Sequence, residues 1–244
     1  MKLSPEERAE RRDSFRQMNL PQKLDYIFSY YKLEIVLALV ALIVFGDIAY
    51  RQINKKEALL YSAYINISVG DDLDAALDAG FVDYVGAARK KNAVYIYRGL
   101  YLAQDPSADN HQYAYASRLK LLASIEAKKL DIVLMNREAY DLLSHSEYLY
   151  AIPDILARDD PLYPLLEPYM TANTVILEDN SIEYNLHEAE VYEVVTAEAV
   201  NGIDVSTFPL FQNAGFSDNV YLGVIGNSPR LPTVFQYIAY LAAA

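Results

Sequence analysis

The sequence predicts an α/β domain preceded by one transmembrane helix, and three observations support this fold class. An apolar stretch covers residues 33–50, near the beginning of the chain. After it, apolar runs alternate with helical patterns in the order strand, helix, strand, helix, strand, which is typical of βαβ units around a parallel sheet. Further strand-forming segments and a helix with one apolar face then end the chain.

The stretch at 33–50 has 18 residues, of which only Glu34 and Asp47 are charged. At helical rise it measures about 27 Å, slightly less than the roughly 30 Å of a hydrocarbon core. Its uninterrupted part, residues 35–46, has only 12 residues, a length also found in buried helices of soluble proteins. Eleven Leu, Ile, Val and Phe residues nevertheless favour insertion over the cost of acids near the ends. Three tyrosines flank the two acids at interfacial positions: Tyr30, Tyr31 and Tyr50.

A cleaved signal peptide fits this stretch poorly, because it starts about 30 residues into the chain and no A-x-A-like site follows. We therefore expect an uncleaved signal anchor. Seven Lys and Arg residues precede it and three follow closely, so the positive-inside rule puts the amino terminus in the cytoplasm. The predicted parts are a cytoplasmic tail with an amphipathic helix (1–32), the anchor (33–50) and an extracytoplasmic domain (51–244).

The amphipathic helix is predicted from apolar residues at helical spacing, namely Leu24, Ile27, Phe28 and Tyr31. Such a helix lies on a membrane surface, runs into the span or docks to a cytoplasmic partner, and the pattern does not separate these interpretations. Asp47, near the outer end of the anchor, is interpreted as reaching water, although acids inside membranes are often functional.

The predicted extracytoplasmic domain is acidic, since 14 Lys and Arg against 26 Asp and Glu give a net charge of −12. Such a charge disfavours nucleic acid and anionic polymers, and suits neutral, cationic or metal-bridged partners. The alternative is that the charge only keeps the domain soluble. The chain has no cysteine, which excludes disulfides, thiolate metal sites and a cysteine nucleophile.

Within the domain, the predicted strands are residues 58–68, 92–103 and 130–136, with helices after the first two and at 137–145. The third strand is wholly apolar, as expected of a central parallel strand. Residues 152–170 contain four prolines and predict short helices and turns. Two extended segments follow, with turns predicted at Asp179-Asn180 and Asn201-Gly202. A strand at 219–226, a turn and a helix with one apolar face end the chain.

Two segments resemble a known superfamily. "YASRLKLLASIEAKKLDIVLMNREAYDLLSHSEYLYAIPDIL" (115–156) is similar to the helix, short turn, strand and following helix of type 2 periplasmic (extracellular solute) binding proteins. "NVYLGVIGNSPRLPTVFQYIAYL" (219–241) resembles their closing strand, turn and helix. Together with "MNLPQKLDYIFSYYKLEI" (18–35), the chain is similar to uncharacterised single-pass membrane proteins of Gram-positive bacteria.

The resemblance implies an ectodomain like one lobe of a solute-binding protein. Two lobes that close on a solute need roughly twice the mass available in about 194 residues, so we expect a single lobe without hinge closure. We therefore expect a non-catalytic, membrane-anchored binding or interaction module of a membrane or envelope complex. A solute receptor feeding a transporter or sensor is the alternative, and an envelope-polymer hydrolase is a more distant one.

Ligands of open parallel sheets bind beyond the carboxyl ends of the strands. We expect any small neutral or cationic ligand to bind there, at residues that follow the predicted strands. These candidate residues are Ser68, Asp71, Asp72, Tyr101, Gln104, Asp105, Asn136, Arg137, Asp204 and Asn227.

No motif for a metal, a cofactor or catalysis stands out. The acids of "DDLDAALD" (71–78) lack the glycine and terminal glutamate of an EF-hand loop, and acids are favoured in a first helical turn in any case. The three histidines, His111, His145 and His187, have no metal-binding spacing. The chain also lacks a P-loop, a G-x-G-x-x-G and a G-x-S-x-G motif, so we expect no cofactor and no enzymatic activity.

Overall fold

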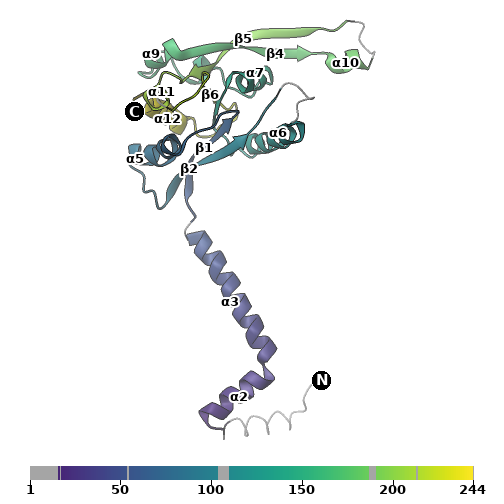
Figure 1. The fold of residues 1–244 in the computed structure, drawn as a ribbon, viewed down its shortest axis with the longest axis vertical. Helices are drawn as coiled ribbons and strands as arrows, with labels where there is room; N and C mark the ends of the chain where they lie inside the picture. The colour runs from purple at the N-terminus through teal and green to yellow at the C-terminus, as the bar shows by residue number, and fades with distance from the viewer. Residues whose placement is uncertain are drawn as a thin grey trace. The chain divides into compact units, whose positions relative to one another are not determined.

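The computed structural model of the protein describes residues 16, 18–53, 55–103, 110–186, 191–212 and 214–243. The chain divides into two compact units, residues 1–55 and 56–244. The elements of both units are labelled in Figure 1, and each unit has its own internal contacts.

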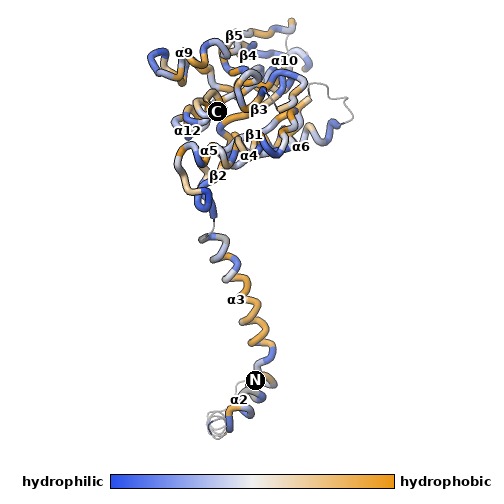
Figure 2. The backbone as a smooth tube through the Cα atoms, turned by 60° about the vertical axis from the view of Figure 1, so that its left-hand side comes forward, coloured by the Kyte–Doolittle hydropathy of each residue, from blue (hydrophilic) through white to orange (hydrophobic). Residues whose placement is uncertain are grey.

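The first unit contains two helices, α2 (Leu20–Tyr30) and α3 (Lys32–Ile53). α2 begins directly after Asn19 and has Pro21 in its first turn, and the Asn19 backbone N–H donates to Gln22 Oε1 at 3.1 Å, as in a capping box. Figure 2 colours most of α3 as hydrophobic, and its apolar side chains are exposed, with Leu42 and Phe45 both at 71%. Among the residues that the structure describes, no helix has both the length and the apolar character that crossing a membrane requires.

Three parallel strands make up one half of the sheet in the second unit. β1 (Glu57–Ile65) lies between β2 (Asn92–Leu100) and β3 (Ile132–Met135) and pairs with both in parallel. All four residues of β3 are buried, as its wholly apolar sequence predicts. The three strands predicted at the start of the domain are therefore confirmed, although each ends earlier than the sequence indicates.

The other half of the sheet consists of the last three strands, which run antiparallel to their neighbours. The strand order is β2-β1-β3-β6-β5-β4, where β4 is Met170–Asp179, β5 is Val194–Asp204 and β6 is Tyr221–Val224. β6 is antiparallel to β3, and β5 is antiparallel to both β6 and β4. The whole is a mixed α/β fold with one six-stranded sheet, and the strands that follow the βαβαβ part extend this same sheet.

One predicted turn is wrong. Asn201 and Gly202 lie inside β5 and not at a chain reversal. Gly202 is needed there for a different reason: a Cβ at this position would lie 2.5 Å from Cζ and Oη of Tyr140. The turn predicted at Asp179-Asn180 is confirmed, since β4 ends at Asp179 and a short helix, α10 (Ser181–Asn185), follows.

Helices cover both faces of the sheet. The connection from β1 to β2 contains α4 (Asp71–Ala75), the π-helical turn η1 (Ala76–Gly80) and α5 (Phe81–Tyr84). The connection from β2 to β3 contains α6 (His111–Glu126). Because the two connections cross the sheet in opposite directions, the same right-handed sense places their helices on opposite faces.

The first face also carries the carboxyl-terminal helix and the short helices. Leu60, Ile132 and Leu222 point to this face from three neighbouring strands, and α12 (Leu231–Ala243) packs on them. Several one-turn helices border the same core, namely α8 (Ile152–Ile155), α9 (Tyr163–Leu166), η2 (Glu167–Tyr169) and α11 (Pro209–Gln212). On the second face, α6 and α7 (Arg137–His145) pack on Val133 and Met135.

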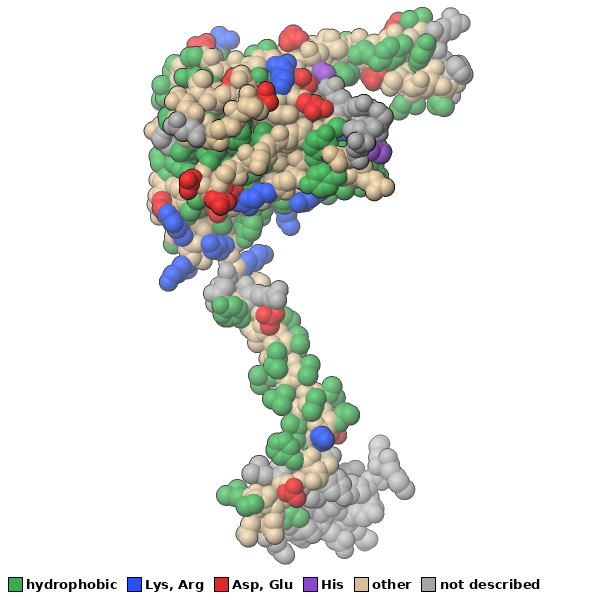
Figure 3. Space-filling model, viewed as in Figure 1, with side chains coloured by type: hydrophobic (Ala, Val, Ile, Leu, Met, Phe, Trp, Pro, Cys, Tyr) green, Lys and Arg blue, Asp and Glu red, His purple; other side chains and the backbone are tan. Residues whose placement is uncertain are grey.

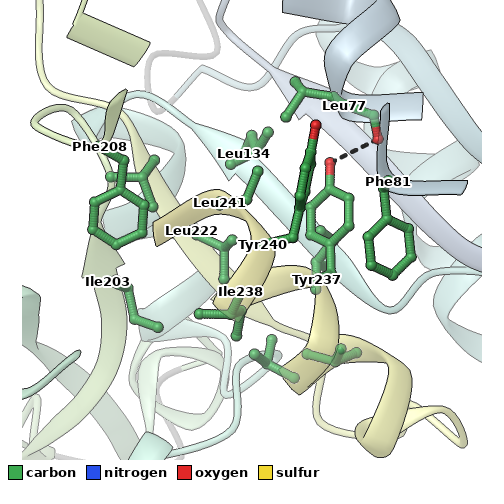
Figure 4. Packing of buried hydrophobic residues seen from close by; sticks show 14 of the residues in the cluster. Leu77, Phe81, Leu134, Ile203, Phe208, Leu222, Tyr237, Ile238, Tyr240 and Leu241 are labelled. Carbon is green, nitrogen blue, oxygen red and sulfur yellow. Dashed lines mark hydrogen bonds between the residues drawn. The ribbon is translucent and has the colours of Figure 1, made fainter. Parts of the chain in front are cut away.

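Figure 4 shows how α12 is held on the first face. The Tyr237 hydroxyl donates to the Leu77 carbonyl at 3.1 Å, and its ring meets the edge of the Phe81 ring at 4.8 Å between centroids. The Tyr240 hydroxyl donates to the Ala76 carbonyl at 3.0 Å. Both carbonyls lie in η1, so the tyrosines satisfy backbone oxygens of the widened turn.

A buried carboxylate joins three segments near the amino end of β3. Asp131, just before β3, is 0% exposed, and its Oδ2 accepts from the Tyr61 backbone N–H and from Arg230 Nε, each at 2.8 Å. Its Oδ1 accepts from Ser228 Oγ at 2.7 Å. The Arg230 guanidinium also covers the Tyr61 ring, 4.7 Å from its centroid, and donates to the Lys128 carbonyl. β1, β3 and the turn after β6 are therefore joined through one charged side chain.

Because three tyrosines are buried, we expect the domain to lose stability at alkaline pH. Burial raises the pKa of Tyr64, Tyr140 and Tyr237 above the ordinary value near 10. Below pH 10 these groups are neutral in both the folded and the unfolded chain and add no pH dependence. As the pH rises above 10, the unfolded chain loses their protons while the folded chain keeps them. The free energy of unfolding then falls by about 1.4 kcal/mol per pH unit for each such tyrosine.

The measurement is a series of unfolding curves between pH 8 and pH 12, with tyrosinate absorbance recorded in parallel. Tyr237→Phe is the matched variant and is expected to lower the slope by one tyrosine's share. Deprotonation of the three buried tyrosines near pH 10 in the folded protein, with no loss of stability, would contradict the prediction.

Candidate functional site

The carboxyl edge of the parallel strands is the region where the sequence predicts a site. β1, β2 and β3 end at this edge, and β5, which runs in the same direction as β3, also ends there. Of the ten candidate residues, Gln104 and Asp105 lie outside the described residues. Seven of the other eight lie at this edge, either at the end of a strand, in the loop after it or at the start of the next helix.

Asn136 and Arg137, after β3, are held by their own helix. Asn136 caps α7, because its Oδ1 accepts from the Ala139 backbone N–H at 3.0 Å. Arg137 Nε lies 2.8 Å from Asp141 Oδ1, one helical turn further on. The Arg137 guanidinium also stacks over Tyr221, 5.8 Å from the ring centroid. Helix capping and an internal ion pair thus occupy both side chains.

Asp204, at the end of β5, is also engaged by neighbouring groups. Its Oδ1 accepts from the backbone N–H and the hydroxyl of Ser206, and its Oδ2 accepts from Asn219 Nδ2 at 2.9 Å. Asp204 pairs with Tyr221 across the ladder, which in turn pairs with Met135. This carboxylate therefore closes the turn after β5.

The remaining candidates at this edge lie in the connections after β1 and β2. Ser68 is exposed in the loop after β1, and Asp71 and Asp72 are exposed in the first turn of α4. Tyr101 stacks on Tyr113 with 6.4 Å between centroids. These four candidates therefore lie on two different connections, the one from β1 to β2 and the one from β2 to β3.

Asn227 lies at the opposite edge, and its expected position is therefore wrong. The reason is strand direction: β6 runs antiparallel to β3, so its carboxyl end meets the amino end of β3. Asn227 Nδ2 donates to the Ile125 carbonyl at 2.8 Å, at the end of α6.

Sequence reasoning missed two groups at the carboxyl edge. Asn66 joins the ends of β1 and β2, because its Nδ2 donates to the Leu102 carbonyl and its Oδ1 accepts from the Leu102 N–H at 2.8 Å. Its φ of 57° is a conformation that asparagine tolerates better than most residues. Arg98 on β2 makes a two-pronged ion pair with Asp74 on α4, at 2.9 and 2.6 Å. No short motif signals either pairing.

These contacts limit the chemistry available at the edge. Asp74, Asp141 and Asp204 are each engaged by a cation or by hydrogen-bond donors. Over the described ranges, no group of three or more His, Cys, Asp or Glu side chains is arranged to hold a metal ion.

A small hollow of about 280 Å³ lies on the second face, between α6, α7 and the segment after β2. Leucines line most of it, together with Arg118, Ser146 and Tyr148. None of the eight described candidate residues contributes to its wall.

The feature that stands out most is an exposed apolar extension of the β4–β5 hairpin. We define the distal arm as the described residues 176–186 and 191–195 of this hairpin. In Figure 1 it runs along the top of the domain and ends at α10. Large apolar side chains are exposed along it: Leu177, Ile182, Tyr184, Leu186, Val191, Tyr192, Val194 and Val195. Patches of this kind commonly mark interaction surfaces.

Comparison with models of protein families, with curated proteins and with solved structures finds no match to this chain. The resemblance to a lobe of a solute-binding protein therefore stays a prediction from the sequence pattern.

Proposed function

We propose that the chain is a membrane-anchored, extracytoplasmic interaction module of a membrane or envelope complex, without catalytic activity. The observation on which this rests is the distal arm. Its exposed leucine, isoleucine and valine side chains would be a liability on a free monomer. A partner that buries them accounts for their presence.

The carboxyl edge supports the same proposal. A catalytic site needs a base or nucleophile that is free to reach a substrate. The carboxylates of Asp74 and Asp141 are instead paired with Arg98 and Arg137 of the same chain. These pairs hold helices against strands or brace a helix turn, which is a role in the fold.

The proposed anchor is residues 33–50, and its support comes from the sequence. Eleven Leu, Ile, Val and Phe residues favour insertion, and the excess of Lys and Arg before the stretch favours a cytoplasmic amino terminus. With this orientation, residues 51–244 lie outside the cytoplasm.

The proposal predicts that the full-length chain stays in membranes after alkaline carbonate extraction. External protease on intact cells is expected to degrade residues beyond 51. Val40→Arg combined with Ile43→Arg is expected to release the chain, because each charge near the middle of a span costs about 2.5–3.5 kcal/mol.

The matched control is Leu165→Arg, at an exposed position on α9, which is expected to leave membrane retention unchanged. Release of the unmodified chain by carbonate, or protection of residues beyond 51 from external protease, would refute the anchor and its orientation.

A further inference from the structure

Hydrogen bonds and a ring contact join the two described parts of the distal arm. Asn180 organises it: its Nδ2 donates to the Val191 carbonyl at 2.9 Å, and its Oδ1 accepts from the Glu193 N–H at 2.8 Å. The rings of Tyr184 and Tyr192 lie 5.8 Å apart across the tip. A surface that is already ordered loses less conformational entropy when a partner binds it.

The root of the hairpin is fixed to the rest of the domain by α7. Tyr140 Oη lies 2.8 Å from both the Thr171 carbonyl oxygen and Asn201 Oδ1. Ser144 Oγ donates to the Thr174 carbonyl at 2.8 Å. These bonds involve β4 only up to Thr174, so the distal arm begins where these bonds to α7 end.

Beyond this root, the apolar side chains are open to solvent. Ile182, Leu186 and Val191 are 69%, 63% and 62% exposed, which is unusual for a group of residues so close in sequence. β4 is also an outer strand of the sheet, with β5 as its neighbour in the ladder. Exposed outer strands are sites where other chains pair or pack.

The charge around these side chains has one sign. Between Arg158 and Arg230 the chain has no Lys or Arg and twelve Asp and Glu, so these 71 residues account for the whole net charge of −12. Four of the twelve acids lie in the distal arm. Figure 3 shows hydrophobic and acidic side chains on the visible face of the arm, without Lys or Arg.

This charge decides which occupant fits. A second copy would bring an arm of the same sign against the first, and like charges across an interface are unfavourable. An anionic lipid surface is repelled for the same reason. A protein surface that has an apolar groove bordered by Lys and Arg meets both features of the arm.

We propose that the distal arm docks into an apolar, Lys- and Arg-bordered groove of a partner protein in the membrane or envelope. This inference rests on the proposed function and names the contact surface and the charge of its partner. The apolar side chains supply the buried area, and the acids around them select the partner and speed its approach.

The test uses the full-length chain in native membranes, with a photo-crosslinking amino acid at Val191 on the arm. The same amino acid at Leu119 on α6 or at Leu165 on α9, both exposed, serves for the body of the domain. The expected result is a crosslink from Val191 to one protein, within a peptide rich in apolar residues and Lys or Arg. Crosslinks from the two body positions to that protein are expected to be about tenfold weaker.

Two matched sets of variants test the two features of the arm. Glu178→Lys with Glu193→Lys is expected to lower the Val191 crosslink about tenfold or more, while Glu57→Lys with Glu126→Lys leaves it unchanged. Ile182→Ser with Leu186→Ser is expected to lower it similarly, while Leu119→Ser with Leu165→Ser does not. Reversing the charge of the crosslinked Lys or Arg in the partner is expected to restore the crosslink to the charge-reversed arm.

The outcomes separate this inference from the proposed function. A crosslink to a second copy or to lipid, or one that charge reversal leaves intact, overturns the docking assignment. A partner that crosslinks only to the body positions also overturns it, but leaves the interaction module standing. Absence of any protein crosslink from all three positions overturns both.

Discussion

Replacing Asp131 by alanine is expected to lower the free energy of unfolding by about 3–5 kcal/mol, because removing one partner of a buried ion pair leaves the others unsatisfied. The Tyr61 N–H, the Ser228 hydroxyl and Arg230 Nε all donate to this carboxylate. Alanine accepts none of these bonds, and the Tyr61 N–H stays enclosed between two strands. The change therefore weakens the joint between β1, β3 and the turn after β6.

The measurement is thermal or urea unfolding of the full-length chain, where a loss of this size lowers the midpoint by roughly 6–20 °C. Arg89→Ala is the control, because Arg89 pairs with Asp83 at the surface and both side chains are more than half exposed. It is expected to leave the midpoint unchanged within error.

The double variant Asp131→Ala with Arg230→Ala should lose less stability than the sum of the two single variants, because the two side chains share one network. Additive losses would show that they act independently.

Replacing Tyr140 by alanine is expected to cost about 3–5 kcal/mol, as for other fully buried aromatic side chains. The Tyr140 ring stacks on Tyr221 with 4.9 Å between centroids, and its hydroxyl joins α7 to β4 and β5. Tyr140→Phe keeps the ring and is expected to cost about 1–3 kcal/mol, because it leaves the half-buried Thr171 carbonyl and the buried Asn201 side chain short of a donor. Tyr115→Ala, at an exposed position, is the control and is expected to have little effect.

The close approach of Tyr140 to Gly202 gives a sharper test of the same packing. Gly202→Ala is expected to cost about 1–3 kcal/mol, because the new Cβ would lie 2.5 Å from the Tyr140 ring and hydroxyl. In a Tyr140→Leu background that contact is gone, so most of the cost should disappear. An equal cost in both backgrounds would mean that Gly202 is required for its backbone and not for the space it leaves.

Hydrogen exchange reports where the Tyr140 variants act. Amides at the root of the hairpin, near Thr171 and Asn201, are expected to exchange faster in Tyr140→Ala. Amides of β1 and β2 should change only with global unfolding. Protection lost equally in all strands would indicate that the hairpin root is not a separate unit of stability.

The parallel part of the fold was predictable because its signals are local. The buried strand "LDIVLMN" (130–136) and the helical patterns around it set strand and helix identity within short windows. The right-handed connection rule then leaves few arrangements for three such strands. The short helices between 151 and 169 follow from their prolines in the same local way.

The candidate site was predictable only in part. Strand ends locate the carboxyl edge, and Asn136, Arg137 and Asp204 do lie there. Asn136 and Arg137 are engaged by residues three and four positions further on, and Asp204 by Ser206 and the more distant Asn219. These contacts depend on the folded geometry, which the pattern of residue types does not give, so the sequence proposed as ligands several residues that the fold already uses.

The sequence alone was sufficient for the three parallel strands, the helices between them and the acidic character of the domain, because these depend on nearby residues and on composition. Tertiary structure decided the rest. Because β6 runs antiparallel to β3, Asn227 lies at the edge opposite to the carboxyl edge. Asn201 and Gly202 lie in a strand that packs on Tyr140 and not in a turn, and the apolar side chains of the distal arm are exposed. Each of these depends on pairing between segments that are distant in the chain, where direction and register are set by the packing of whole elements and not by the residues next to one another.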